Sequence, residues 1–576
     1  MSVHDLVIRG GSVVDGTGRP ATTADIAVDD GLVTEVGRLD DTSASRTIDA
    51  DGLLVTPGWV DIHTHYDGQA TWDDTIAPSS WHGVTSIVMG NCGVGFAPAQ
   101  PDQHDWLIGL MEGVEDIPGT ALAEGMTWGW ESFPEYLDVL DDGRWTVDIG
   151  TQIAHGAVRA YVMGERGARN EPATAEDIAA MKRLVKEAVA AGALGFSTSR
   201  TIAHRAIDGE PVPGTYAAED ELFGIGAALG ELGTGVFELA PDGVAGEDFV
   251  APRREVDWMR RLSTAIGRPV TFALLQVDSA PDLWQELMDA SLEAVEDGAD
   301  LRPQVAGRAT GLLSGHFASY CLFDLIPAYQ ALKSRGLSQD DFFAALVDTE
   351  LRRSIEEWEP EGGQVGQMKS AYESTYSLGM PPDYEPGPER SLAGIAAASG
   401  RTPLAVAYEA MLQDRGQGLL YLPILNYSNG DLEPARQMLL HPQAAAGLGD
   451  GGAHCGVICD ASQPTFMLTH WVRDRTRGER LPLEWMVKKQ TLDTAQLYGL
   501  GDRGTLEPGK LADINVIDFE RLQLGNPRVH SDLPAGGRRL LQGATGYVAT
   551  IKSGTATFEN GEDTGERPGV LLRGSR

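Results

Sequence analysis

Two histidines and one distant aspartate are the side chains of this sequence whose types and spacing best suit chemistry. His63 and His65 close an apolar, strand-like run that begins at Leu53. Side chains two residues apart on a strand point to the same face, so both imidazoles would project from one surface. Asp450 ends a second short apolar stretch and is followed by two glycines. Neutral imidazoles at this spacing can chelate a divalent ion, most often zinc, and the set favours metal-assisted hydrolysis.

The segments around these residues alternate short apolar runs with helical stretches, which is typical of a parallel sheet. Met181 to Val189, for example, has the apolar spacing of three and four expected of a covering helix. The candidate strands end near His65, Cys92, His155, Thr198, Ala240, Gln276, Gly307 and Asp450. A parallel barrel brings such strand ends together at its C-terminal mouth. We therefore predict an α/β fold, a (β/α)8 TIM barrel over residues 56–500.

Both ends of the chain have the character of short strands. Residues 1–55 contain alternating apolar runs, and Asp29-Asp30-Gly31 is typical of a hairpin turn. Similar runs return only in residues 501–576, for example at Asp513–Ile517. Because isolated hairpins are marginally stable, we expect the two ends to complete one small sheet domain together.

The gap between the seventh and eighth predicted strands, about residues 310–440, is far longer than an ordinary connection in such a fold. It includes the Pro- and Gly-rich stretch Pro381–Pro388. We interpret this gap as an inserted, partly helical subdomain that could cover the site.

The composition limits the class of partner. The formal net charge is −39, which argues against nucleic acid and against anionic membrane surfaces. The sequence has no apolar run long enough to span a bilayer, and Met1 to Asp5 lead into a strand without the features of a secretory signal. Four cysteines in 576 residues do not make a disulfide framework. We therefore expect a cytoplasmic protein that binds a small molecule; whether it forms a homo-oligomer is left open.

Several motifs add a family resemblance that runs in order from about residue 5 to about residue 573. They are Pro57–His65, Asn91–Pro98, Ala154–Arg159, Gly192–Thr198 and Asp532–Arg539. The first resembles the opening barrel strand of the amidohydrolase superfamily, and the others resemble its N-acyl-D-amino-acid deacylase (D-aminoacylase) branch. The resemblance implies a (β/α)8 barrel with a small β-sandwich built from both termini.

The resemblance also implies roles for individual residues. Cys92 matches a position where the deacylases carry a metal-ligating cysteine, so His63, His65, Cys92 and Asp450 form the expected metal-ligand set. Two departures matter: Ala240 and Leu274 stand where the deacylases have metal-binding histidines. Neither side chain can ligate an ion, and we therefore expect one zinc ion.

The remaining candidates would contact substrate. Glu238 lies two residues before Ala240 and should face the barrel interior, where a buried carboxylate needs a metal or an arginine such as Arg308 as its partner. Arginines suit a substrate carboxylate because of their planar fork. The substrate-binding candidates are His155, Arg200, His204, Arg205, Glu238, Arg308 and His454.

These observations lead to one expected function and two alternatives. The expected function is hydrolysis of a non-peptide C–N bond in an N-acyl-D-amino acid or related N-acylated carboxylate. Metal-activated water would attack, and Asp450 would act as general acid and base. The first alternative is hydrolysis of a cyclic amide, lactam or carbamate. The second is a non-catalytic binding or assembly protein of the same fold.

Overall fold

Strands from both ends of the chain form one sheet. The computed structural model describes residues 3–40, 42–360 and 364–574. Within them, a nine-stranded sheet combines β1 (Val3–Val13), β2 (Thr22–Asp29), β3 (Leu32–Gly37), β4 (Ser43–Asp49) and β5 (Leu54–Pro57) with β18 (Ile514–Ile517), β23 (Tyr547–Lys552), β24 (Thr555–Glu559) and β25 (Glu562–Asp563). The antiparallel pair β5–β18 joins the two halves. The predicted hairpin turn is present, since Asp30 and Gly31 both have positive φ values between β2 and β3.

Parallel strands alternate with helices through the middle of the chain. They are β6 (Trp59–Asp61), β7 (Val84–Met89), β8 (Asp148–Thr151), β9 (Ile153–Ala154), β10 (Gly195–Ser199), β11 (Val236–Ala240), β12 (Val270–Ala273), β13 (Leu301–Val305) and β17 (Ala445–Ala446). They pair in the orders β6-β7-β8 and β17-β13-β12-β11-β10-β9. Every residue of β7, β8, β10, β11 and β12 is buried, as expected of parallel strands covered on both faces.

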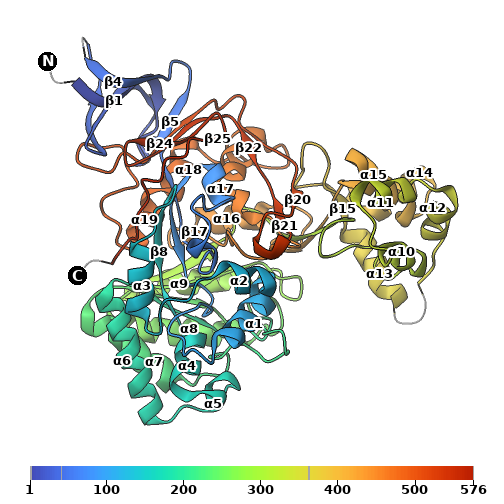
Figure 1. Cartoon of the computed structure of the whole chain (residues 1–576), viewed down its shortest axis with the longest axis horizontal. Coiled ribbons are helices and arrows are strands. Elements are labelled where there is room, and N and C mark those ends of the chain that lie inside the picture. The colour runs from blue at the N-terminus through green and yellow to red at the C-terminus, as the bar shows by residue number, and fades with distance from the viewer. Residues whose placement is uncertain (1–2, 41, 361–363, 575–576) are drawn as a thin grey trace.

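The helices that accompany these strands lie together at the lower left of Figure 1. They are α1 (His104–Glu115), α2 (Gly119–Gly125), α3 (Phe133–Asp141), α4 (His155–Met163), α5 (Glu165–Ala168), α6 (Ala175–Ala191), α7 (Glu219–Leu232), α8 (Ala251–Ile266) and α9 (Leu283–Glu296). Helix α6 confirms the predicted covering helix: it buries Met181, Val185, Ala188 and Val189. A capping box between Thr174 and Asp177 begins it.

The long segment between β13 and β17 has a hydrophobic core of its own. Its strands β14 (Thr310–Ser314), β16 (Leu420–Leu425) and β15 (Tyr376–Ser377) form an antiparallel sheet. Its helices are α10 (Pro327–Lys333), α11 (Gln339–Leu346), α12 (Thr349–Glu356), α13 (Gln364–Ser374), α14 (Leu392–Ser399) and α15 (Pro403–Gly416). Phe323, Leu346, Ile355 and Tyr408 pack in its centre. In Figure 1 these helices form a lobe at the right, beside and not over helices α1 to α9.

The rest of the chain returns to the parallel strands and then to the terminal sheet. Its helices are α16 (Glu433–Leu440), α17 (Gln463–Phe466), a π-helix (Met467–Asp474), α18 (Leu483–Gln490) and α19 (Leu492–Leu497). Short pairs join β19 (Gln523–Leu524) to β22 (Ala544–Thr545) and β20 (Arg528–His530) to β21 (Arg539–Leu541). Among the residues that the structure describes, none of the helices combines the length and apolar character needed to cross a lipid bilayer.

A buried ion cluster ties the terminal sheet to the parallel strands. Arg503 Nη1 donates to Asp148 Oδ2 on β8 at 2.6 Å, and Lys552 Nζ lies 2.9 Å from the same oxygen. Lys552 on β23 also donates to Asp513 Oδ1 at 2.9 Å. Since all four side chains are buried, each charge depends on its partners for compensation.

Replacing Lys552 by Met should therefore destabilise the protein strongly. Asp148 and Asp513 would remain buried with less positive charge, at a cost of about 3–5 kcal/mol. Urea unfolding followed by circular dichroism measures this loss. The matched control is Lys510→Met, because Lys510 Nζ donates only to the carbonyl of Gly501 near the surface. Equal stability of the two variants would contradict a central role for the cluster.

Candidate metal centre

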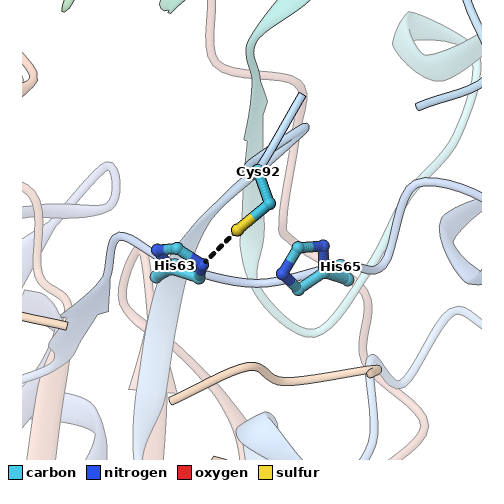
Figure 2. Close-up of side chains that lie close together, drawn as sticks. All are labelled: His63, His65 and Cys92. Atoms are coloured by element: carbon cyan, nitrogen blue, oxygen red, sulfur yellow. Dashed lines mark hydrogen bonds between the residues drawn. The ribbon is translucent and has the colours of Figure 1, made fainter. Parts of the chain in front are cut away.

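The backbone that carries His63 and His65 is held on both sides. Strand β6 ends at Asp61, so the two histidines lie just beyond it and not within it as predicted. Thr64 forms an isolated parallel bridge with Gly451, and its backbone N–H donates to Val88 O at 3.1 Å. The N–H of His65 donates to Gly451 O at 2.7 Å. These bonds keep the segment extended, so both imidazoles still point to one side, as Figure 2 shows.

Cys92 reaches the same place from the turn after β7. Its backbone is left-handed, with φ of 54°, a conformation that costs a non-glycine residue about 1 kcal/mol. The turn is fixed because Asn91 Nδ2 donates to Thr64 O at 3.1 Å and the Cys92 N–H donates to Glu238 Oε2 at 2.9 Å. Cys92 Sγ lies 3.3 Å from His63 Nε2 (Figure 2). One donor atom from each of His63, His65 and Cys92 lies within 4.8 Å of the other two.

Asp450 completes the group from the segment after β17. Its Oδ1 lies 3.3 Å from His63 Nε2 and 3.8 Å from His65 Nε2. The glycine that follows is required by space: a Cβ on Gly451 would lie 2.5 Å from Ser79 Oγ. We call His63, His65, Cys92 and Asp450 the donor cluster. The structure thus brings together the four residues predicted as metal ligands.

The donor cluster has the distances and chemistry of a zinc site. Zinc bonds of about 2.0–2.3 Å place tetrahedral ligand atoms about 3.3–3.8 Å apart. The distances from His63 Nε2 to Cys92 Sγ and to Asp450 Oδ1, both 3.3 Å, and from His65 Nε2 to Asp450 Oδ1, 3.8 Å, fall in that range. Burial lowers the pKa of His63 to about 4 and that of His65 well below its usual value, so both imidazoles are neutral, as ligands must be.

The acidic groups nearby lack a compensating cation. Burial raises the pKa of Asp450 to about 6, that of Glu238 to about 8, and that of the Cys92 thiol well above its usual value. In the described part of the chain, His65 Nδ1, Glu115 Oε1 and Glu238 Oε1 are buried without a hydrogen-bond partner. A divalent cation at the donor cluster would supply the positive charge that these groups need. The residues present therefore fit such an ion.

Two of the predicted substrate residues have internal partners. His155 is fully buried, with Nδ1 2.8 Å from Thr198 Oγ1 and Nε2 2.9 Å from Glu221 Oε1. Both ring nitrogens are therefore engaged within the protein. Glu238 lies inside the parallel strands as predicted, but its partner is the Cys92 backbone and not Arg308.

The three candidate arginines differ in how they are held. Arg200 donates to both oxygens of buried Glu255, at 3.1 and 2.8 Å, and Arg308 donates twice to Asp460 Oδ1, at 3.0 and 2.8 Å. Arg205 donates to the carbonyl of Gly209 at 2.8 Å. Of the three, only Arg205 has no carboxylate partner within the ranges that the structure describes.

His204 and His454 both lie near the donor cluster. Each imidazole contributes to the lowered pKa of His65, although burial and His63 contribute more. His204 Nδ1 lies 3.0 Å from Ser199 Oγ, and burial lowers its pKa to about 3. His454 Nε2 lies 3.8 Å from Glu115 Oε2. Burial also lowers the pKa of His454, so both imidazoles are neutral.

Three polar residues around the donor cluster were not predicted. Gln304 Oε1 lies 2.8 Å from His63 Nδ1, Glu115 Oε1 lies 3.4 Å from His65 Nδ1, and buried Asp67 accepts a bond from Gly90 N at 3.2 Å. The alternation His63, His65, Asp67 could have pointed to the last of these. Glu115 ends helix α1, and nothing in its local sequence distinguishes it from a surface glutamate.

Comparisons with known proteins identify the family of the chain. The model of the Amidohydrolase family matches residues 46–558. A D-aminoacylase of Alcaligenes xylosoxydans xylosoxydans is 27% identical over 578 residues, which cover 99% of this chain and 97% of that protein.

Solved structures share the fold. A crystal structure of a D-aminoacylase superposes with a TM-score of 0.65 at 24% identity, covering 99% of this chain and 100% of the other. The N-acyl-D-glutamate deacylase of Bordetella bronchiseptica, complexed with zinc and a phosphonate inhibitor, gives 0.63 at 22% identity, with coverage of 99% and 100%.

Zinc should stabilise the protein through the donor cluster. At a free zinc concentration one hundred times the dissociation constant, the free energy of unfolding should rise by about 2.7 kcal/mol. His63→Ala should lose this gain. His82→Ala should keep it, because the ring nitrogens of buried His82 bond Thr465 Oγ1 and the Gln542 carbonyl and not the donor cluster. Urea unfolding with zinc and with a chelator measures both, and a full zinc response in His63→Ala would exclude the cluster as the binding site.

Proposed function

We propose that this chain, which belongs to the amidohydrolase family, hydrolyses an N-acyl-D-amino acid or a related N-acylated carboxylate at the donor cluster. Family membership makes it a hydrolase of carbon–nitrogen bonds other than peptide bonds. The observation that carries the proposal is the convergence of two neutral imidazoles, a thiol and a carboxylate. The D-aminoacylase relative supports the choice of substrate class.

Each residue of the donor cluster has a role in this proposal. His63, His65, Cys92 and Asp450 would hold the ion. A bound divalent ion lowers the pKa of water to about 7 and polarises a carbonyl oxygen. Asp450 takes the proton from the attacking water and delivers it to the leaving nitrogen. His204 and His454, whose imidazoles both contribute to the lowered pKa of His65, would hydrogen-bond the substrate.

We propose one zinc ion per chain. Ala240 and Leu274 are both buried, and neither side chain has an atom that can ligate a metal. Glu238 Oε2 accepts a hydrogen bond from the Cys92 backbone N–H. A second ion would therefore find the unpartnered Glu238 Oε1 here but no imidazole at Ala240 or Leu274.

We also infer a closed eight-stranded barrel with a two-ended β-sandwich. β8 and β9 are separated only by Gln152, and the Thr64–Gly451 bridge links the segments after β6 and β17, which supports closure. The proposed boundaries are residues 1–55 and 501–576 for the sandwich, and 56–500 for the barrel with its insertion. Four buried free cysteines support a cytoplasmic location.

A cyclic amide, lactam or carbamate is the second candidate substrate. It is favoured by the pairing of Arg200 with Glu255 and of Arg308 with Asp460, because both cations are already neutralised. A ring substrate without a carboxylate would not need them.

Metal quantification combined with a substrate panel tests the proposal. Purified protein should contain one equivalent of zinc, and a chelator should abolish activity that one equivalent restores. N-acyl-D-amino acids should be cleaved faster than their L enantiomers and faster than lactams. Faster cleavage of lactams would favour the second candidate, and a lack of activity on every compound would favour a binding protein.

Asp450→Asn should reduce turnover without removing the metal. Loss of a general acid–base lowers the rate by a factor of about 10² to 10⁴. Turnover and zinc content are measured on the same preparation. Asp431→Asn is the control, because Asp431 caps the backbone N–H of Glu433 in the loop before α16. Near-native turnover in Asp450→Asn would remove this carboxylate from the mechanism.

Arg205→Ala should weaken the binding of substrates that carry a carboxylate. Losing a charge-assisted hydrogen bond worth about 1.5–3 kcal/mol should raise KM for N-acyl acids by about 10- to 100-fold. The matching amides should change little, and kcat should be preserved. Arg169→Ala, at an exposed arginine paired with Glu165, is the control. An unchanged acid-to-amide preference would place the anchor elsewhere.

A further inference from the structure

We propose that Gln304 and Glu115 are positioning residues that fix the tautomer and orientation of His63 and His65. Each presents an oxygen to the Nδ1 atom of one imidazole, so that the Nε2 atoms face the thiol and carboxylate of the donor cluster. The inference rests on the proposed function, since it assigns to these two residues the support of the metal ligands.

Gln304 holds His63 from strand β13. Its Oε1 accepts a hydrogen bond from His63 Nδ1 at 2.8 Å, and an amide oxygen can only accept. The proton therefore lies on Nδ1, and the lone pair of Nε2 points toward Cys92 Sγ, 3.3 Å away. The amide fits tightly, because a Cβ on Gly447 would lie only 2.6 Å from Gln304 Oε1.

Glu115 holds His65 from the end of helix α1. Its Oε1 lies 3.4 Å from His65 Nδ1, and within the described ranges neither of these two buried atoms has a hydrogen-bond partner. A proton on Nδ1 would give both atoms a partner, and it would leave the lone pair of Nε2, 3.8 Å from Asp450 Oδ1, available to the ion.

The segment after Asp450 pins the end of helix α1. The His454 backbone N–H donates to the Glu115 carbonyl, and Gly456 N donates to Asp116 Oδ2 at 3.0 Å. The carboxylate that orients His65 is therefore fixed by the same segment that supplies Asp450. A shift of this segment would move a donor and its support together.

Gln304 and Glu115 differ in chemical type, since the first offers an amide oxygen and the second a carboxyl oxygen. Histidine ligands commonly donate their second N–H to a carboxylate or a carbonyl, which sets the tautomer and makes the imidazole a stronger donor. A carboxylate does so more strongly than an amide because it stabilises positive charge on the ring. Replacing the Glu115 carboxyl by an amide should therefore weaken the support of His65.

Zinc affinity tests these roles directly. Zinc is titrated into the metal-free full-length protein in competition with a chromogenic chelator. Gln304→Leu and Glu115→Leu should each weaken zinc binding by about 10- to 100-fold. Gln304→Glu keeps an acceptor oxygen toward His63 and should bind zinc at least as tightly as the wild type, whereas Glu115→Gln should fall between wild type and Glu115→Leu.

A second measurement separates positioning from folding. The absorption spectrum of the cobalt-substituted protein reports ligand geometry, and it should change in both leucine variants. Gln276→Leu is the matched control: Gln276 is a buried glutamine whose side chain bonds Pro281 and Ser428 and contacts neither histidine. Its zinc affinity and cobalt spectrum should equal those of the wild type.

Each outcome has a defined meaning. Wild-type affinity in both leucine variants, combined with loss of zinc in His63→Ala, would overturn the positioning roles and leave the proposed function intact. Unchanged zinc binding in His63→Ala would instead refute the metal centre itself. If Gln304→Leu does not fold, the zinc affinity of Gln304→Glu is the test of Gln304. A tenfold weaker zinc affinity in this nearly isosteric variant would overturn the role of Gln304.

Discussion

The donor cluster depends on the pairing of Thr64 with Gly451. This bridge joins the segment after β6 to the segment after β17, which lie far apart in the sequence. Together with the bond from His65 N to Gly451 O, it fixes the distance between the two histidines and Asp450. Only glycine fits at position 451, because Ser79 and Tyr66 fill the space that a side chain would need. Backbone geometry therefore brings these ligands together before any ion contributes.

Assembling the cluster carries a cost in stability. Cys92 and Asp450 both have left-handed backbones, and the carboxylates around them are buried with raised pKa values. Such strain and desolvation persist only where the surrounding structure enforces them. Here the bonds from Asn91 to Thr64 and from Cys92 to Glu238 do so. The surrounding fold must therefore stabilise the cluster more than the cluster stabilises the fold.

The sequence predicted the elements better than the connections between side chains. Apolar runs and glycine turns place the parallel strands within a few residues of their observed ends, because burial on both faces leaves a local pattern. The four residues predicted as metal ligands come from motifs at those strand ends. The partners of Arg200, Arg308 and His155 could not be predicted, since Glu255, Asp460 and Glu221 lie on elements that only tertiary packing brings near. Glu115 was missed for the same reason.

Ala240 on β11 and Leu274 after β12, the two residues predicted to replace metal-binding histidines, also affect the cost of burying polar groups. A buried histidine must satisfy two ring nitrogens, and Ala240 and the buried Leu274 after β12 remove that requirement. Glu238 remains on β11, but it acts on the backbone of Cys92 and so holds the turn that presents the thiol. All four donors thus follow strands β6, β7 and β17. Strand β11 supplies none of these four donors and instead supports the Cys92 turn through Glu238, so the donors lie on one side of the sheet order.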